Sequence, residues 1–356
     1  MPTKPKHQRP SPTPVATRRP ASTASPTVPA GTVGAASTVP AGGEQRQLGR
    51  SGLRVSLVGL GTNNFGGRLD RAGSARVIDA ALDAGITLFD TADAYGNRGG
   101  SETILGEVLG ERRNSIVLAT KFGLPQDDAG RLSGASRSYI IHAVEASLRR
   151  LKTGWIDLYQ LHRPDPATPI DETLRALDDL IRSGKVRYIG ASNLAAWQVV
   201  QAQHIARELG TARFISSQDE FSLLRRDAGR ELVPALAAYD VGLLPYFPLA
   251  NGVLTGKYRP GAAPPAGSRL ANSANLAQRY HTEADLATAE RLATFARERG
   301  HTLLELAFSW LAAQPTVGSI IAGASTAEQV AQNRTAVGWK LTADELTGID
   351  QLLRPV

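Results

Sequence analysis

The feature that most constrains the fold of this chain is a regular alternation, from Gln47 onward, of short apolar runs with amphipathic segments. Such alternation is typical of repeated βα units built around a parallel sheet. Eight units can be counted, and eight is the number that closes a (β/α)8 TIM barrel. The runs predicted to form its strands are Leu57–Leu60, Thr87–Asp90, Val117–Lys121, Ile156–Leu161, Tyr188–Ala191, Phe214–Gln218, Gly242–Pro245 and Val317–Ile321.

The segments around these strands complete the predicted fold. A β-hairpin beginning at Gln47 is expected to cover one end of the barrel. The Gly/Pro-rich segment Gly252–His281 has no clear periodicity, and because long loops in compact domains are usually functional, it is a candidate lid. Two extra helices are expected at Glu283–Arg299 and Thr342–Leu353. The barrel helices are predicted to begin near Ala72, Ser101, Ser136, Asp171, Ala195, Arg230, Thr302 and Thr326.

Residues 1–47 differ in composition from residues 48–356, which we assign to the barrel. They are rich in Pro, Ser, Thr, Ala and Gly with almost no large apolar side chains, so we expect a disordered basic tail. They contain six Lys or Arg and one Glu, and therefore supply +5 of the formal net charge of +7. Because the body is nearly neutral and the tail lacks interleaved aromatic residues, we expect no specific nucleic-acid partner.

The composition also excludes several classes of protein. No apolar run approaches the roughly 18 residues of a membrane span, and no charged start leads into an apolar signal segment. The pair Arg18 and Arg19 is not followed by an apolar stretch, so a twin-arginine export signal is not expected. The absence of cysteine excludes disulfides, zinc-thiolate sites and cysteine nucleophiles, and we expect no metal. We therefore expect a soluble, cytoplasmic protein without a membrane partner.

A Rossmann dinucleotide-binding fold is the main rival. Gly59 and Gly61 follow the first strand, and Asp90 ends the second, as in the G-x-G-x-x-G fingerprint. Asn64 stands where that fingerprint needs its third glycine, and Asp90 lies well beyond the roughly 20 residues that place an acid on the ribose. The βα units also continue to the end of the chain without a separate substrate domain. These differences favour the barrel.

Four titratable residues lie where a barrel carries its chemistry, at the carboxyl ends of strands. Asp90 closes the second strand, Tyr95 follows in its loop, Lys121 closes the third strand, and His162 ends the fourth. Taken singly, a lysine after a strand is more often a surface residue, and a lone histidine is more often structural. Four such groups at one barrel mouth are less easily explained by packing and indicate a catalytic site.

The reaction that fits these groups is hydride addition to a carbonyl carbon, which leaves an alkoxide that needs a proton. We predict that Tyr95 donates it. A lysine ammonium beside a tyrosine favours the phenolate by roughly 1 to 3 pKa units, so Lys121 is expected to lower the pKa of Tyr95. Asp90 would neutralise and orient Lys121, and His162 would hydrogen-bond the substrate oxygen.

The motifs around these residues resemble those of the aldo-keto reductase superfamily. The resemblance runs from about Gln47 to about Asn333, and it implies catalytic roles for the same four residues and an extended NADP(H) over the barrel mouth. The motifs that carry it are FDTADAYG with SETILGEVL, TKFG, DLYQLHRPD, GKVRYIGASN, SQDEFSLL, YFPLANGVLTGKY and IIAGASTAEQVAQN.

The resemblance also implies which residues hold the cofactor. The nicotinamide carboxamide would be hydrogen-bonded and its ring stacked on a tyrosine, the pyrophosphate would be wrapped by a loop and a lysine, and the adenosine 2′-phosphate would sit at a helix N-terminus. The resemblance implies Ser192, Asn193 and Gln218 for the carboxamide and Tyr246 for stacking on the ring. It implies Pro248, Leu249, Asn251 and Lys257 for the pyrophosphate, and Gly323, Ser325, Gln329 and Asn333 for the 2′-phosphate. For Asn193, a helix N-cap is the alternative role.

Two positions depart from the pattern of the family. Phe247 stands where the family usually has serine, and Gln329 replaces an arginine that many NADPH-specific relatives carry, so use of NAD stays open beside NADP. The nearby Phe65, Phe122 and Phe247 could form an apolar pocket wall or pack in the core. The expected partner is a small-molecule carbonyl or alcohol. A second hypothesis is a nucleotide-binding regulatory subunit, because the resemblance extends to potassium-channel beta subunits.

Overall fold

The computed structural model describes residues 1–2 and 44–353. The tail predicted to be disordered lies, for residues 3–43, outside the described residues. The residues from position 44 to 353 belong to one compact unit.

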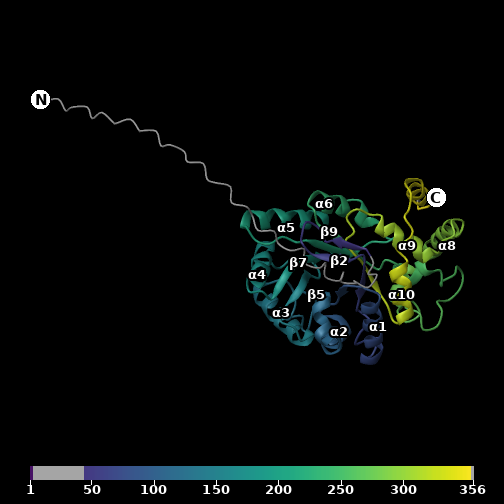
Figure 1. Ribbon diagram of the computed structural model, residues 1–356, viewed down its shortest axis with the longest axis horizontal. Helices are drawn as coiled ribbons and strands as arrows, with labels where there is room; N and C mark the ends of the chain where they lie inside the picture. Colours follow the sequence, from purple (N-terminus) through teal and green to yellow (C-terminus); the bar gives the residue numbers. More distant parts are fainter. Residues whose placement is uncertain (3–43, 354–356) are drawn as a thin grey trace, which may run out of the picture. The chain divides into compact units, whose positions relative to one another are not determined.

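Eight parallel strands close into a barrel, as the sequence predicts (Figure 1). Their order around the barrel is the order of the chain, and the last strand pairs with both the first and the one before it. The strands are β3 (Val58–Gly61), β4 (Leu88–Asp90), β5 (Val117–Phe122), β6 (Ile156–Leu161), β7 (Val186–Ser192), β8 (Ser216–Glu220), β9 (Gly242–Tyr246) and β10 (Ile320–Gly323).

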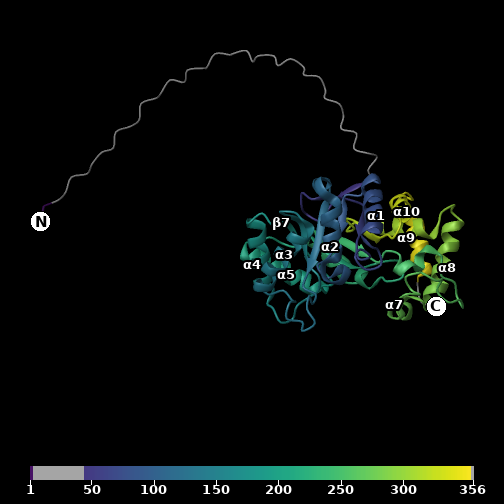
Figure 2. The same ribbon diagram turned by 90° about the horizontal axis from the view of Figure 1, so that it is seen from below.

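Helices surround this barrel (Figures 1 and 2). The barrel helices are α1 (Arg71–Asp83), α2 (Tyr95–Leu109), α3 (Arg137–Leu151), α4 (Ile170–Arg182), α5 (Ala196–Leu209), α6 (Leu232–Ala238), α9 (Leu303–Ala312) and α10 (Ala327–Thr335). The two extra helices are confirmed as α8 (Glu283–Arg297), which packs against α9, and α11 (Ala343–Leu352), which packs against α8. Short 3-10 helices lie at η1 (Gly110–Ser115), η2 (Asp227–Gly229) and η3 (Ala250–Thr255).

Most strands begin or end one to three residues away from the predicted bounds, and the hairpin, the last strand and the candidate lid also differ in other ways. The first strand of the hairpin, β1 (Gln45–Gln47), pairs antiparallel with β2 (Arg54–Ser56), so the hairpin begins two residues before Gln47. The sequence of β1 is polar and shows no apolar alternation, so the start of this strand could not be predicted from the sequence. It is a strand because it pairs with β2. The last barrel strand begins at Ile320 instead of Val317, which forms only an isolated bridge with Leu243. The candidate lid contains a further short helix, α7 (Ala274–Tyr280).

The hairpin closes the amino-terminal end of the barrel. Leu48 is fully buried and belongs to the cluster of side chains that fills the barrel interior together with Leu88, Leu158 and others. A Cβ atom at Gly318 would lie 2.6 Å from the side chain of Leu48, which explains why the chain has glycine there. With this end filled by apolar groups, the opposite end, at the carboxyl ends of the strands, is the one available for a site.

Candidate active site

Lys121 occupies the centre of the predicted catalytic group. Its side chain is fully buried, which rules out the surface role that its position alone suggests. The ammonium Nζ donates to Asp90 Oδ2 at 2.6 Å, to the carbonyl of Thr91 at 2.9 Å and to Tyr95 Oη at 3.4 Å. Burial lowers the pKa of Lys121, but the charge of Asp90, the interaction with Tyr95 and the hydrogen bonds to both together more than offset this, so the pKa lies above its ordinary value. The lysine is therefore a fixed positive charge beside the tyrosine oxygen.

Asp90 is held from its other side by two amides. Its Oδ1 accepts from Gln218 Nε2 at 2.8 Å and from Gln160 Nε2 at 3.2 Å. Sequence reasoning missed Gln160. A signal for it exists, because side chains alternate along a strand and Gln160 on β6 therefore shares a face with His162. Gln218, expected to contact the cofactor, uses one N–H of its amide for Asp90, which leaves its oxygen and its second N–H for another partner.

Tyr95 precedes a left-handed turn. The backbone φ angles of Gly96, Asn97, Arg98 and Gly99 are all positive, so the regular part of α2 begins only after them, near the predicted Ser101. A Cβ at Gly96 would lie 2.4 Å from a backbone oxygen, so this turn depends on glycine. Non-glycine residues with such backbone angles cost free energy and tend to occur at functional sites.

Buried acids anchor this loop from behind. Asp93 accepts a hydrogen bond from Tyr139 Oη at 3.4 Å, and Glu102 pairs with Arg150 at 2.7 Å and accepts from Thr120 at 2.5 Å. Burial raises the pKa of Asp93 to about 8. These contacts join α2, α3 and β5 behind the loop, and they fix the position from which Tyr95 projects.

The pKa of Tyr95 departs from the sequence prediction. Burial raises the pKa of Tyr95 above its ordinary value, and the Lys121 ammonium opposes this rise without cancelling it. Lys121 does act to lower the pKa of Tyr95, as predicted. The pKa is nevertheless higher than its ordinary value, because the prediction left out the cost of burying a phenolate. Tyr95 therefore holds its proton throughout the neutral pH range, as a proton donor must.

His162 lies at the edge of the Tyr95 ring, with ring centroids 5.7 Å apart. Burial, with the charges of Lys121 and Arg163, lowers the pKa of His162 to about 2, so the imidazole is neutral. Its Nδ1 is buried without a hydrogen-bond partner among the described residues. A neutral imidazole beside the tyrosine hydroxyl can hydrogen-bond a substrate oxygen without competing as the acid.

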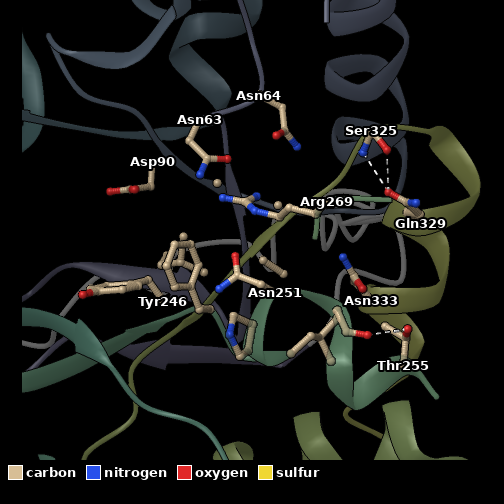
Figure 3. A pocket seen from close by; sticks show the side chains of 18 of the residues that line it. Asn63, Asn64, Asp90, Tyr246, Asn251, Thr255, Arg269, Ser325, Gln329 and Asn333 are labelled. Carbon is tan, nitrogen blue, oxygen red and sulfur yellow. Dashed lines mark hydrogen bonds between the residues drawn. The ribbon is translucent and has the colours of Figure 1, made fainter. Parts of the chain in front are cut away.

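A cavity of about 1030 Å³ extends from these groups across the barrel mouth. This is at the upper end of the range for small-molecule sites. In Figure 3, Asp90 and Tyr246 lie towards one side of it, and Ser325, Gln329 and Asn333 towards the other. Every residue predicted for the catalytic group or the cofactor lines this cavity except Lys121, which lies buried beneath it.

At the catalytic side, Asn193 joins three elements. Its Nδ2 donates to the carbonyl of His162 at 3.0 Å, and its Oδ1 accepts from Tyr246 Oη at 2.8 Å. Its backbone has a φ of 61° and its N–H donates to Asp219 Oδ1 at 3.1 Å. The N-cap alternative is wrong, because the N-cap of α5 is Ala195.

The loop after β9 is strained and carries one unpartnered buried amide. Phe247, Ala250 and Asn251 all have positive φ, and the amide of Asn251 is buried with neither its nitrogen nor its oxygen partnered among the described residues. Phe247 lines the cavity, whereas Phe65 and Phe122 are fully buried in the core. Phe65 and Phe122 therefore pack in the core, and only Phe247 of the three lies in the cavity wall.

At the far side, Ser325 and Gln329 bind each other. Ser325 donates to Gln329 Oε1 from its backbone nitrogen at 2.8 Å and from its hydroxyl at 3.0 Å (Figure 3). Thr326 is the N-cap of α10, and its side chain accepts from the backbone nitrogen of Gln329. Asn333 is buried on the same helix. This turn is an ordered helix N-terminus facing the cavity.

Arg269 was missed by sequence reasoning. It extends from the candidate lid into the cavity, with its guanidinium over the Phe247 ring at 5.2 Å (Figure 3). Burial and the charge of Arg68 lower its pKa. The Gly/Pro-rich sequence around it carries no periodicity that would show which side chain turns inward.

A model of the aldo/keto reductase family matches residues 57–354. The chain belongs to the aldo/keto reductase family. Its relatives include the uncharacterized oxidoreductase YrpG of Bacillus subtilis (strain 168), 37% identical over 87% of this chain and 95% of that protein. A probable voltage-gated potassium channel subunit beta of Oryza sativa subsp. japonica is 38% identical over 83% of this chain and 91% of its own. Versiconal hemiacetal acetate reductase of Aspergillus parasiticus is 34% identical over 86% of this chain and 96% of that protein.

For this member of the aldo/keto reductase family, the described residues include no helix long and apolar enough to cross a membrane.

Proposed function

We propose that this protein is an NADP(H)-dependent oxidoreductase that reduces an aldehyde or ketone to an alcohol, or catalyses the reverse, with Tyr95 as general acid. The observation that supports this most is the position of Tyr95 Oη, 3.4 Å from the buried ammonium of Lys121, at one end of the long cavity. A tyrosine with a charged lysine behind it and a cavity before it is placed to give up a proton and to have the resulting phenolate stabilised.

The hydrogen-bond donors and charges that line the cavity match the polar groups of a nicotinamide dinucleotide. Asn251 has a buried amide without a partner, and Lys257 has no acidic partner among the described residues, so both are free for phosphate and polar groups. Ser192, Asn193, Gln218 and Tyr246 would hold the nicotinamide, the loop with Pro248 and Leu249 the pyrophosphate, and Gly323, Ser325, Gln329 and Asn333 the adenosine phosphate. When bound, the dinucleotide supplies the hydride.

The residues of the chain supply the proton chemistry. Tyr95 Oη donates its proton to the substrate oxygen as that oxygen gains charge. The Lys121 ammonium stabilises the phenolate that remains, and Asp90 keeps Lys121 charged and in place. His162, neutral at physiological pH, hydrogen-bonds the same substrate oxygen and orients the carbonyl.

The choice of NADP over NAD rests on the turn at Ser325. The Gln329 oxygen is occupied by Ser325, so its amide nitrogen remains to donate to a phosphate, together with the N-terminus of α10. No arginine stands at this position, and we expect NADPH to be preferred over NADH by a smaller factor than an arginine would give. Steady-state KM values for the two cofactors measure this preference.

Replacing Tyr95 with Phe tests the proposal. The variant should lose about 10²- to 10⁴-fold in kcat for carbonyl reduction, because the ring remains but the proton donor does not. Its dissociation constant for NADPH, measured by quenching of protein fluorescence, should stay within about twofold of the wild-type value, since the hydroxyl contacts Lys121 and not the far cavity. Retained turnover would remove Tyr95 from its role.

A regulatory subunit that senses nucleotide is the second candidate, favoured by the similarity to proteins named as potassium channel subunits. A panel of aldehydes, ketones, sugars and steroids separates the two. An enzyme should turn over at least one of them in multiple cycles, whereas a sensor should bind NADPH and complete few cycles. The intact group around Lys121 favours the enzyme.

A further inference from the structure

Asp219 is a buried acid beside the nicotinamide end of the cavity. It lies on β8, one residue after Gln218, and only 6% of it is exposed. Its Oδ2 accepts from the Ser217 hydroxyl at 2.5 Å, and its Oδ1 accepts from the backbone N–H of Asn193 at 3.1 Å. No Lys or Arg among the described residues forms an ion pair with it. A neutral side chain could satisfy the same two groups without the cost of burying a charge, so packing alone does not explain the acid.

The N–H of Asn193 is the contact through which Asp219 reaches the cavity. This N–H is shared between Asp219 and the carbonyl of Gln218, which lies 3.2 Å from it. Asn193 has a φ of 61°, a left-handed conformation that costs free energy in a residue other than glycine. Because a charged acceptor binds an N–H more strongly than a neutral one, the carboxylate form of Asp219 stabilises this conformation best.

From this conformation the side chain of Asn193 reaches two residues of the proposed site. Its Nδ2 donates to the carbonyl of His162 at 3.0 Å, and its Oδ1 accepts from Tyr246 Oη at 2.8 Å. Burial, with the charges of Glu220 and Asp219, raises the pKa of Tyr246 to about 12, so its hydroxyl keeps the proton that makes this bond. The positions of the Tyr246 ring and of the His162 backbone therefore depend on Asn193.

We propose that Asp219 is a positioning residue for the nicotinamide end of the cavity: as a carboxylate it holds Asn193, and through Asn193 it places Tyr246 and His162. This inference rests on the proposed function, because that proposal assigns Asn193 and Tyr246 to the nicotinamide. Asp219 does not itself line the cavity, so it acts through Asn193.

The ionisation of Asp219 makes this role measurable as a pH dependence. Burial raises the pKa of Asp219 to about 6, although the hydrogen bonds from Ser217 and Asn193 oppose the rise. Below pH 6 the protonated acid is a weaker acceptor, so Asn193 is held less firmly. The cofactor should therefore bind more weakly as the pH falls through 6.

The titratable groups around Asp219 differ from it in their behaviour near pH 6. Tyr246, on the neighbouring β9, has its pKa at about 12, and His162 has its pKa at about 2, so neither changes charge there. Glu220, next to Asp219 on β8, is paired with Arg279. A change in cofactor binding near pH 6 that is lost when residue 219 cannot ionise therefore reports on Asp219 itself.

The dissociation constant for NADP⁺, an acid-stable probe, tests the role when it is measured by quenching of protein fluorescence between pH 5 and pH 8. Asp219→Asn keeps an oxygen acceptor for Asn193 but cannot ionise, so any pH dependence that remains in it comes from NADP⁺ or from other groups. Between pH 7.5 and pH 5 the wild-type value should rise about tenfold more than that of Asp219→Asn, with a midpoint near pH 6.

Three further variants sharpen this test. Ser217→Ala removes a hydrogen bond that lowers the pKa of Asp219, so it should move the midpoint to higher pH. Asp219→Ala removes the acceptor and should raise the dissociation constant at pH 7.5 about tenfold, as expected for one lost charge-assisted hydrogen bond. Asp178→Asn is the matched control, because Asp178 is also buried and accepts from a backbone N–H, that of Ala212, at 2.9 Å. It should change neither the dissociation constant nor the midpoint.

Two results would overturn the inference. The first is a pH dependence that is the same in the wild-type protein and in Asp219→Asn. The second is an Asp219→Ala variant that binds NADP⁺ at pH 7.5 as tightly as the wild-type protein. If Asp219→Ala does not fold, the comparison with Asp219→Asn decides alone.

An NMR titration separates this inference from the proposed function, because it needs no cofactor. In the free protein with 15N-labelled asparagine, the backbone amide resonance of Asn193 should shift with a midpoint near pH 6, and in Asp219→Asn it should not. Such a shift in a protein that neither binds NADP⁺ nor reduces a carbonyl would support the link between Asp219 and Asn193, and the proposed function alone would fail. A wild-type resonance that does not shift would contradict the inference whatever the activity.

Discussion

Asp90, Tyr95 and Lys121 at the catalytic end of the cavity form one hydrogen-bonded group, and only His162 Nδ1 and Gln160 Oε1 lack partners beside it. The polar side chains of the loop wall, Asn251, Lys257 and Arg269, have no hydrogen-bonding or acidic partner among the described residues. The catalytic group lies on or just after β4, β5 and β6, whose register fixes the distances between its members. The loop wall comes from irregular segments with positive φ angles. The difference indicates that the catalytic end is organised before any ligand binds, while the loop wall is completed by a ligand.

The largest effect expected from this comparison is at Lys121. Lys121→Met would leave Asp90 buried and unpaired, and breaking a buried ion pair costs about 3–5 kcal/mol in the free energy of unfolding. Carbonyl reduction should also fall by at least about 10²-fold, because the phenolate of Tyr95 loses its counter-charge. Urea denaturation and steady-state kinetics measure the two effects.

The double variant Lys121→Met with Asp90→Leu is the control. Because no buried charge is left, it should recover most of the stability but none of the activity. If the double variant is as unstable as the single one, the pair does not act as a unit and the catalytic end is not organised as described.

Asn251 tests the loop wall, with an effect smaller than that at Lys121. Asn251→Gly keeps the positive φ without strain and removes an amide that has no partner, so the free energy of unfolding should change by less than about 1 kcal/mol. The dissociation constant for NADPH should rise about tenfold, the value of one lost hydrogen bond to a charged or polar group. Asn272→Gly, at an exposed position of the same segment, should change neither quantity. A large loss of stability with unchanged NADPH binding would show that Asn251 serves the fold.

A further effect, seen only as the pH falls, concerns the pH dependence that His162 gives to stability. Its folded-state pKa of about 2 lies below the ordinary value of 6.5, so the unfolded chain binds the proton more readily. The contribution is complete above pH 6.5 and is lost as pH falls towards 2, by about 1.4 kcal/mol per pH unit well below 6.5. His162→Gln should lack this slope when unfolding is followed between pH 6 and pH 4.5. An identical slope in both proteins would contradict the buried, neutral imidazole.

The sequence by itself was sufficient to predict the barrel and to place at one mouth the four residues for which we propose catalytic roles. Short apolar runs between amphipathic segments mark the strands, and the carboxyl ends of parallel strands meet at one mouth, so Asp90, Lys121 and His162 could be placed together without coordinates. The helices α8 and α11 followed from their amphipathic patterns, whereas the first strand of the hairpin was predicted two residues late.

Only the tertiary structure decided which polar groups bind each other and which face the cavity. Gln160 and Gln218 both turn to Asp90, Arg269 turns inward from a segment without periodicity, and the pKa of Tyr95 rises where the lysine alone would lower it. The physical reason is that local patterns specify the element on which a side chain lies, whereas partners, burial and local charge depend on segments far apart in the sequence.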